Sequence, residues 1–499
     1  MTVGTNNLGE ETAGDLGVGA DDGDEVRHTG TGPDTSSVSE AGGGGNDDKV
    51  AAFLARCGLR ASAVAAAHDF ARTKFPGCEV APAPFQGYCS YTLLLLPQTP
   101  GGRRRDSRVD AGDGSGGGSE SSDTGVKSGV PAGAERGSNL LVQFRPRRHG
   151  IDAGMCAEAR DVLGGRIVPD VEDLGVLTGL ETAGTEARGG NDALCAYALE
   201  RAGGISLTRF RGLLATSGTD PRACRRRIVA DLAVVFADAW RGRRDERDIV
   251  KGKVGGSLRW RLEVLVEGLP GELREVARRT MEELAGVEGS LPWVVTHGDL
   301  VPDNILVHPP PRGDGDGAGG RRRKEMRERA GGLVGLIDWA EAEWLPFGVG
   351  MYGLEEVLGE DVPVEDDSQG TGGGTGATRF EYYPEASALR RLFWDEVGRV
   401  VGDELVIRRA RLAQVLGVLL WRGIAFDDGA LERVVDEERD WWDMQRLRTW
   451  LFGERGLGLG GSREPGEEGE EAVVVVEKDE KRRLLRKIWR LTTSCFKAL

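Results

Sequence analysis

The sequence has only seven cysteines and five histidines in 499 residues. The cysteines lie singly along the chain, with no Cys-x-x-Cys pair, and no histidines stand at the spacing of a zinc site. A disulfide-stapled secreted domain and a structural zinc domain are therefore both disfavoured. Scattered single thiols are typical of a reducing, intracellular setting.

Long hydrophobic runs are also missing. No uninterrupted apolar stretch approaches the roughly 20 residues that a membrane-spanning helix needs. Met1 is followed by glycines and acids, whereas a secretory leader would have a basic residue and an apolar core. We therefore expect a soluble, cytoplasmic protein with no transmembrane segment, and we see no internal repeat.

Large apolar residues are scarce in several segments that are rich in glycine, of which the chain has 77. Such segments cannot bury enough surface to offset the entropy of ordering. We predict a disordered tail at 1–48 and disordered insertions at 98–138, 309–332 and 365–379. The tail has eleven acids against one arginine, so it supplies −10 of the net charge of −16. The rest is only mildly acidic, and nothing indicates nucleic-acid binding.

The remaining sequence falls into a strand-rich first part and a helix-rich second part. The first part predicts two helices split at Gly58, a hairpin over 78–97, a third strand over 139–146, a helix over 152–165 and a strand beginning near 193. The second part shows helical periodicity over 226–240, 385–400 and 405–426. This order predicts an α+β fold.

One stretch, "THGDLVPDNILVH", places Asp299 and Asn304 in a short polar loop between two apolar runs. A second apolar run, "LVGLI", ends at Asp338, and a hairpin would bring that carboxylate back to the loop. Carboxylate and amide oxygens form a plausible site for a hard cation with a base beside it. That set suits phosphoryl transfer, in which the protein neutralises phosphate and orients a hydroxyl. The alternative is that Asp299 and Asn304 merely cap and turn the loop.

The two motifs "HGDLVPDN" and "LIDW" resemble the catalytic loop and metal-binding motif of the aminoglycoside phosphotransferase and choline kinase-like family, relatives of protein kinases. The resemblance runs from about Phe85 to Gly353 and is nearest to the fungal branch of phosphotransferase-family proteins. It implies a two-lobed, protein-kinase-like fold. The small antiparallel-sheet N-lobe would span 49–200 and bind the nucleotide, and the larger helical C-lobe would span 201–454.

The same resemblance implies roles for four residues around the loop. His297 would support the loop, and Asp299 would accept the proton of the substrate hydroxyl. Asn304 and Asp338 would bind magnesium. The implied function is an ATP- and Mg-dependent phosphotransferase that moves the γ-phosphate to a hydroxyl group of a small molecule.

In the N-lobe, the resemblance places a phosphate-covering loop at "PFQGYCSYTL", with Gly87, Cys89 and Ser90 at its turn. A glycine here lets backbone N–H groups approach phosphate, although an ordinary hairpin turn would use one as well. Backbone groups near Leu199, in the connection between the lobes, would meet the adenine.

The third strand ends in "VQFR", which aligns with the kinase "VAIK" and puts Arg145 at the phosphate-pairing lysine position. Arginine keeps the positive charge but differs from lysine in length and geometry. An exposed strand-end arginine is the alternative, and Arg147 and Arg148 compete for the role. The expected carboxylate partner on the next helix is Glu158.

The acceptor is left open by the sequence. An acidic, aromatic pocket suited to an amine-bearing hydroxyl compound is one hypothesis, and a solvated acidic face is the other; the residues concerned are Glu341, Glu343, Trp344, Trp441 and Trp442. A pseudokinase that binds nucleotide or acts as a scaffold is the alternative function, favoured by Arg145 and by the weak glycine loop. A protein substrate ranks last, because no "APE"-like segment follows "IDW".

The last segment, 455–499, reads as a Gly/Glu linker followed by a basic amphipathic tail. The tail either docks on its own lobe or touches an anionic membrane surface. The nucleotide preference and the oligomeric state are not indicated by any pattern.

Overall fold

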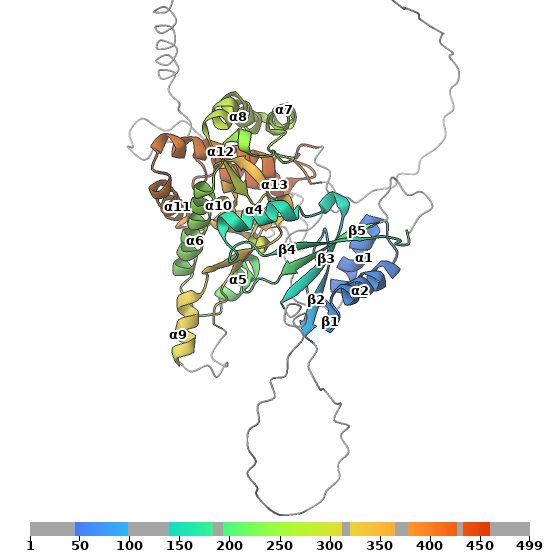
Figure 1. Cartoon of the computed structure of the whole chain (residues 1–499). Helices are drawn as coiled ribbons and strands as arrows, with labels where there is room; N and C mark the ends of the chain where they lie inside the picture. Colours follow the sequence, from blue (N-terminus) through green and yellow to red (C-terminus); the bar gives the residue numbers. More distant parts are fainter. Residues whose placement is uncertain are drawn as a thin grey trace, which may run out of the picture. The chain divides into compact units, whose positions relative to one another are not determined.

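The computed structural model describes residues 45–97, 139–182, 193–311, 320–364, 378–426 and 433–459 (Figure 1). The predicted tail up to residue 44, the insertion 98–138 and the basic C-terminal tail lie outside the described residues. No helix in the described ranges has the length and apolar character needed to cross a membrane.

A five-stranded antiparallel sheet forms the centre of the N-lobe, in the order β1-β2-β3-β5-β4. Its strands are β1 (Cys78–Pro82), β2 (Tyr91–Pro97), β3 (Leu140–Pro146), β4 (Val171–Leu177) and β5 (Leu194–Glu200). The predicted hairpin and third strand are confirmed as β1, β2 and β3. Strand β4 was not predicted, because this edge strand is only partly buried and shows no clean apolar alternation.

Helices pack beside this sheet and complete the N-lobe (Figure 1). They are α1 (Gly45–Cys57) and α2 (Ser62–Lys74), whereas the single turn η1 (Arg147–His149) leads into α4 (Ala153–Leu163), whose buried residues belong to the apolar core of the C-lobe. Phe53 of α1 and Ala67 of α2 belong to one apolar core with Leu93 and Phe144 of the sheet. The two predicted helices split near Gly58 are therefore confirmed.

Helices dominate the C-lobe, and all of them except the exposed α9 contribute to a second, larger apolar core. They are α5 (Leu207–Leu214), α6 (Pro221–Arg241), α7 (Leu258–Gly268), α8 (Gly271–Ser290), α9 (Gly320–Arg329), α10 (Tyr352–Val357), α11 (Ala386–Val401), α12 (Glu404–Arg422) and α13 (Trp441–Phe452). Single turns also occur at η2 (Glu246–Asp248), η3 (Pro302–Asn304), η4 (Trp339–Glu341) and η5 (Val349–Met351). The sheet-then-helix division confirms the α+β fold class.

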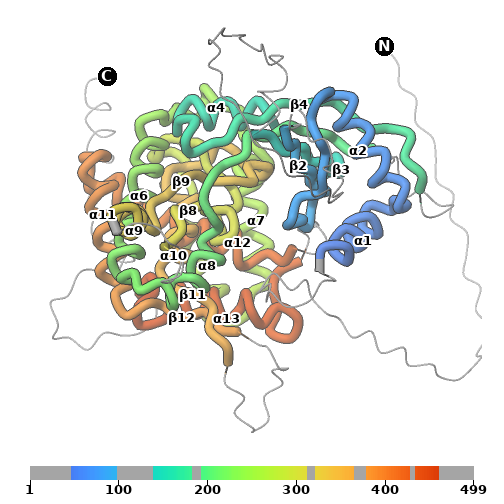
Figure 2. The backbone as a smooth tube through the Cα atoms, turned by 90° about the horizontal axis from the view of Figure 1, so that it is seen from below, coloured from blue at the N-terminus to red at the C-terminus, as the bar shows by residue number. Residues whose placement is uncertain are grey.

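Short strands within the C-lobe carry the polar loops. They are β6 (Ile205–Ser206), β7 (Trp293–Thr296), β8 (Ile305–Val307), β9 (Leu333–Leu336), β10 (Glu343–Pro346), β11 (Gly359–Pro363) and β12 (Thr378–Tyr382). They form a three-stranded sheet, β6-β8-β9, and two antiparallel pairs, β7 with β10 and β11 with β12. Strands β8 and β9 lie side by side (Figure 2), as the predicted hairpin requires.

Three of the segments predicted to be disordered include residues that form a helix or a strand in the structure. Residues 320–329 of the insertion 309–332 form α9, so the prediction is wrong there. Arginine, lysine and glutamate favour helices, and the ion pairs Arg321–Glu325 (3.2 Å) and Lys324–Glu328 (3.8 Å) add i,i+4 support. Helix α1 likewise begins at Gly45, inside the predicted tail, and β12 begins at Thr378, inside the insertion 365–379.

Candidate active site

The loop after β7 turns sharply at Gly298. Its φ of +82° lies in the left-handed region, which favours glycine. A Cβ added to Gly298 would lie 1.9 Å from the carbonyl oxygen of Glu341, so no other residue fits without moving the chain. Strand β10, which follows Glu341, pairs with β7, and this pairing holds the two segments together.

His297 links the loop to the strand that leads to Asp338. Its Nε2 lies 2.8 Å from the carbonyl oxygen of Ile337, and its Nδ1 lies 3.3 Å from the backbone nitrogen of Asp299. The ring packs against Trp339, with centroids 4.6 Å apart. Burial lowers the pKa of His297 to about 4, so the ring is neutral and can donate through Nε2–H while Nδ1 accepts.

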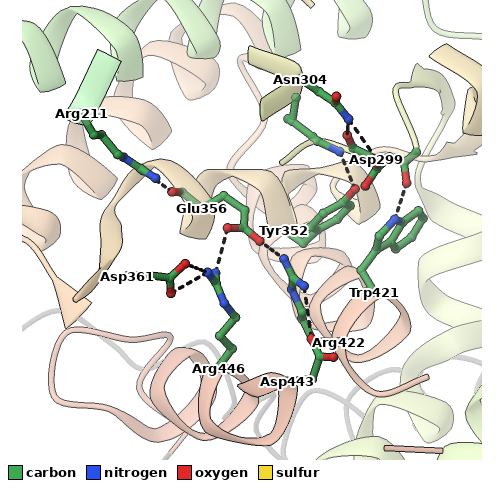
Figure 3. A network of polar contacts seen from close by, with 12 residues as sticks. Arg211, Asp299, Asn304, Tyr352, Glu356, Asp361, Trp421, Arg422, Asp443 and Arg446 are labelled. Atoms are coloured by element: carbon green, nitrogen blue, oxygen red, sulfur yellow. Dashed lines mark hydrogen bonds and ion pairs between the residues drawn. The ribbon is translucent and has the colours of Figure 1, made fainter. Parts of the chain in front are cut away.

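Asp299 and Asn304 are joined directly. The Asn304 Nδ2 donates to Oδ2 of Asp299 at 3.0 Å and to its backbone oxygen at 2.9 Å (Figure 3). Burial and the nearby charge of Asp338 raise the pKa of Asp299, the charge of Arg422 lowers it, and the net value is about 7. The Asp299 carboxyl therefore changes its protonation state near neutral pH.

Asp338 follows β9 and reaches the same loop. Ile305 of β8 pairs with Leu336 of β9, and the N–H of Ile337 donates to the carbonyl of Asn304 at 3.0 Å. Among the described residues other than glycine, Asp338 alone has a positive φ, at +63°. Aspartate tolerates this conformation better than most residues, and such backbone strain often occurs at functional sites.

Arg145 reaches the C-lobe from the end of β3. It is 3% exposed, and its Nη2 donates to Oδ1 of Asp338 at 2.6 Å. Its Nε donates to Oε1 of Gln143 at 3.1 Å and its Nη1 to the His149 carbonyl at 3.4 Å. The two competing arginines, Arg147 and Arg148, are exposed in η1, so Arg145 is the arginine of "VQFRPRR" that contacts a predicted metal ligand.

The predicted pairing of Arg145 with Glu158 is wrong. Glu158 lies on α4, and its Oε2 accepts instead from Arg244 Nη1 at 3.1 Å and from Trp344 Nε1 at 3.0 Å. The face of α4 that carries Glu158 is thus directed at C-lobe residues. Sequence spacing alone could not reveal the rotation of this helix.

The loop between β1 and β2 is held by hydrogen bonds from Gln86, which was not predicted to be a site residue. Gln86 Nε2 donates to the carbonyls of Ala83 (3.1 Å) and Thr92 (2.9 Å), and its Oε1 accepts from Thr92 N–H at 2.8 Å. At the turn, a Cβ on Gly87 would lie 2.9 Å from the buried Ser90 hydroxyl. Glutamine at a turn carries no established sequence signal, so Gln86 could not be identified in advance.

Cys89 lies at the tip of the same loop, close to the ion pair. Burial raises the pKa of its thiol to about 11, and the charges of Arg145 and Asp338 also act on it. Leu199 is buried in β5, opposite Leu141 of β3, one residue before the strand ends and the chain crosses to β6. Cys89 and Arg145 thus lie near Asp338. Leu199 instead lies in the sheet, just before the connection between the lobes.

Two residues of the hypothetical amine pocket are part of the protein's own packing. The buried carboxylate of Glu343 accepts the backbone N–H groups of Val254 (3.0 Å) and Gly255 (2.7 Å). Trp344 is buried and bonded to Glu158. Glu341 is exposed, and its charge acts on Asp299, so it is the acid of this group that lies near the loop without being committed to packing.

The loop offers side-chain oxygens from Asn304 and Asp338, and magnesium prefers oxygen ligands. Asn304 turns its amide nitrogen to Asp299, which leaves Oδ1 for a cation, and Asp338 is 40% exposed with only Oδ1 engaged by Arg145. Among the described residues, no three Asp, Glu, His or Cys side chains form a metal cluster. Magnesium often takes one or two protein ligands and completes its shell with water and phosphate oxygens, so these two residues fit it.

Residues outside both motifs also hold the loop. The backbone N–H of Leu300 donates to the Tyr352 hydroxyl at 2.8 Å, and the Trp421 indole N–H donates to the carbonyl of Gly298 (Figure 3). Tyr352 and Trp421 are 52 and 123 residues from their partners in the chain. In the sequence, Tyr352 and Trp421 occupy ordinary apolar positions of helical segments. No sequence pattern therefore indicated that they hold the loop.

No family model and no curated protein matches this chain. Solved structures do match. One is a candidate aminoglycoside phosphotransferase from Ralstonia eutropha JMP134, with 13% identity, a TM-score of 0.34, and coverage of 74% of this chain and 93% of that one. A glucosamine kinase has 14% identity, a TM-score of 0.31 and coverage of 71% and 76%.

A microcompartment-associated aminopropanol kinase has 13% identity, a TM-score of 0.30 and coverage of 72% of this chain and 89% of its own. All three neighbours carry the names of phosphotransferases or kinases of small molecules.

Proposed function

We propose that the protein is an ATP- and magnesium-dependent phosphotransferase of the aminoglycoside phosphotransferase and choline kinase-like type, which transfers the γ-phosphate to a hydroxyl of a small molecule. One observation carries the proposal. The half-buried Asp299 is bonded to Asn304 and lies within electrostatic range of Asp338, although Asp338 is 34 residues further along the chain than Asn304. A mere loop cap would not need a second carboxylate.

Asp299 is the general base in this proposal. A base works best when its pKa lies close to the working pH, and burial brings the pKa of Asp299 to about 7. Its bond from Asn304 fixes the orientation of the carboxylate. The other oxygen can therefore accept the proton of a substrate hydroxyl that attacks the phosphate.

Asn304 Oδ1 and Asp338 would hold magnesium, which would supply neutralisation of the phosphate charge. Arg145 would pair with a nucleotide phosphate, because a guanidinium binds phosphate through two parallel N–H groups. Backbone N–H groups around Gly87, Cys89 and Ser90 would cover the phosphates. The backbone near Leu199 would meet the adenine.

An amine-bearing alcohol is the proposed acceptor class. Because Glu343 is committed to packing, the acid that would bind the amine is Glu341, whose exposed carboxylate lies near Asp299. An acid beside the base would attract a cationic substrate. If only neutral or acidic alcohols are phosphorylated, this part of the proposal is wrong, whereas the phosphotransferase proposal stands.

Turnover of ATP with magnesium, measured across a library of amino-alcohols, sugars and aminoglycosides, tests the function. Asp299→Asn keeps the shape and removes the base, so we expect a loss of at least about a hundredfold in kcat, the lower range of general-base catalysis. Asp303→Asn is the matched control, because Asp303 is an exposed acid in the same loop. Equal turnover by the wild type and Asp299→Asn would refute the assignment.

A nucleotide-binding protein without turnover is the second candidate. The observation that favours it is the ion pair between Arg145 and Asp338, in which a permanent charge already occupies one oxygen of the proposed metal ligand. Calorimetric titration with Mg-ATP separates the two candidates. Binding of Mg-ATP with no turnover of any acceptor would support the second.

A further inference from the structure

The catalytic loop is held on both sides of Asp299 by aromatic side chains. The residue before it, Gly298, receives the Trp421 indole N–H on its carbonyl, and the residue after it, Leu300, donates its N–H to the Tyr352 hydroxyl at 2.8 Å (Figure 3). Both contacts are to the backbone. They therefore set the path of the chain through Asp299 and do not engage its carboxylate.

The two aromatic rings also support each other. Tyr352 and Trp421 stack with centroids 4.6 Å apart and an interplanar angle of 16°. Tyr352 is 1% exposed, and burial raises the pKa of its phenol well above the usual value, so the hydroxyl stays neutral. Because Tyr352 is buried and stacked on Trp421, packing holds the two rings that make these hydrogen bonds.

Ion pairs fix the helices that carry this pair. Arg422, the residue after Trp421 in α12, binds Glu356, which lies one turn after Tyr352 in α10 (Figure 3). Glu356 also accepts from Arg446 of α13 at 2.9 Å. Burial raises the pKa of Glu356, but Arg422 and Arg446 outweigh burial and lower it overall, so this carboxylate is charged.

We propose that Tyr352 and Trp421 are positioning residues for catalysis, which act by holding the backbone on either side of Asp299. This inference rests on the proposed function for its catalytic meaning. A displacement of a reacting group by about 1 Å can cost a hundredfold in rate, so the loop that carries the base gains from support outside the site. Neither side chain contacts the reacting atoms.

Two conservative variants remove one hydrogen bond each: Tyr352→Phe removes the phenol oxygen, and Trp421→Phe removes the indole N–H. We expect each to lower kcat about tenfold, the effect of one hydrogen bond of roughly 1.4 kcal/mol, with little change in the KM for ATP. The double variant should lose less than the product of the two, because both bonds act on one loop.

Hydrogen exchange followed by mass spectrometry gives a readout independent of turnover. Peptides covering 296–304 should exchange faster in Tyr352→Phe, because the Leu300 N–H loses its acceptor. Tyr382→Phe is the matched control, since it removes a buried phenol bond of 2.5 Å to Glu355. Trp260→Phe, at an exposed tryptophan of α7, is the control for the indole. Neither control should alter kcat or exchange at 296–304.

Unchanged exchange at 296–304 in Tyr352→Phe would overturn the inference. Faster exchange with an unchanged kcat in both Tyr352→Phe and Trp421→Phe would also overturn it, because the two hydrogen bonds would then have a structural role only. A wild type without any turnover would refute the proposed function and with it the catalytic role of the pair. The exchange result would still show in that case whether Tyr352 holds the loop.

Discussion

At the scale of single residues, burial acts on two neighbours in opposite directions. It raises the pKa of Asp299 to about 7 and lowers that of His297 to about 4. Desolvation disfavours the charged form of each group. Between these values Asp299 is largely protonated and His297 is neutral, so neither side chain carries much charge until the pH approaches neutrality.

The rate should therefore depend on pH through Asp299. Only the ionised carboxylate can accept a proton, so we expect kcat/KM to rise with pH on an acid limb centred near 7 and to level off above it. Steady-state rates between pH 5 and 9 at saturating magnesium measure this limb. A plateau that extends down to pH 5 would contradict the raised pKa.

The free energy of unfolding should also depend on the ionisation of Asp299, but in the opposite sense to the rate, because it falls as the pH rises. A pKa of about 7 in the fold, above the ordinary 3.8, means that the stability from Asp299 is complete below about pH 3.8 and is lost as the pH rises to about 7. Asp299→Asn has no such loss. Its Tm advantage over the wild type should grow from pH 4 to pH 7 and then stay constant, as measured by thermal unfolding, with Asp303→Asn showing no such trend.

At the scale of helices and strands, the ion pairs below the loop connect α10, α12 and α13. Glu356, 1% exposed, holds both Arg422 and Arg446. We expect Glu356→Ala to lower the free energy of unfolding by about 3 kcal/mol or more, because two buried guanidinium groups lose a partner. Urea unfolding measures this loss.

The control for this prediction is Glu325→Ala on the exposed helix α9, where the ion pair with Arg321 is open to solvent. Such pairs contribute about 0.5 kcal/mol or less. A change of under about 1 kcal/mol in Glu356→Ala would mean that the arginines find other partners, such as Asp443 at 3.2 Å from Arg422 or Asp361 at 2.7 Å from Arg446.

Elements with a local cause could be predicted from the sequence. The hairpin followed from apolar runs around a glycine turn, and Asp338 could be placed near Asn304 because antiparallel strands return the chain to its starting point. Glu158 was assigned the wrong partner, and the bonding of Glu343 to backbone N–H groups could not be foreseen, since both depend on how α4 and β10 pack. Helix α9 was missed because composition alone was used to predict disorder.

At the scale of the whole molecule, the two apolar cores are joined by a polar contact in which Arg145 of the N-lobe meets Asp338 of the C-lobe. Lysine at 145 would keep the charge, but its single ammonium cannot reach Gln143, His149 and Asp338 together. We expect Arg145→Lys to raise the KM for ATP several-fold, by about 1 kcal/mol of binding.

The control is Arg148→Lys, at the exposed arginine nearby, which should leave the KM unchanged. Initial rates at varied ATP and fixed magnesium give both values. An unchanged KM in Arg145→Lys would show that the geometry of the guanidinium does not contribute to nucleotide binding.

The left-handed backbone at Gly298 and Asp338 has a consequence for protein engineering. Both polar loops depend on a chain reversal that ordinary residues resist, and at the first reversal the Glu341 carbonyl also leaves no room for a side chain. Grafting the side chains of Asp299, Asn304 and Asp338 onto another scaffold would therefore not transfer the site. The two turns and the strand pairing between them would have to be transplanted as one unit.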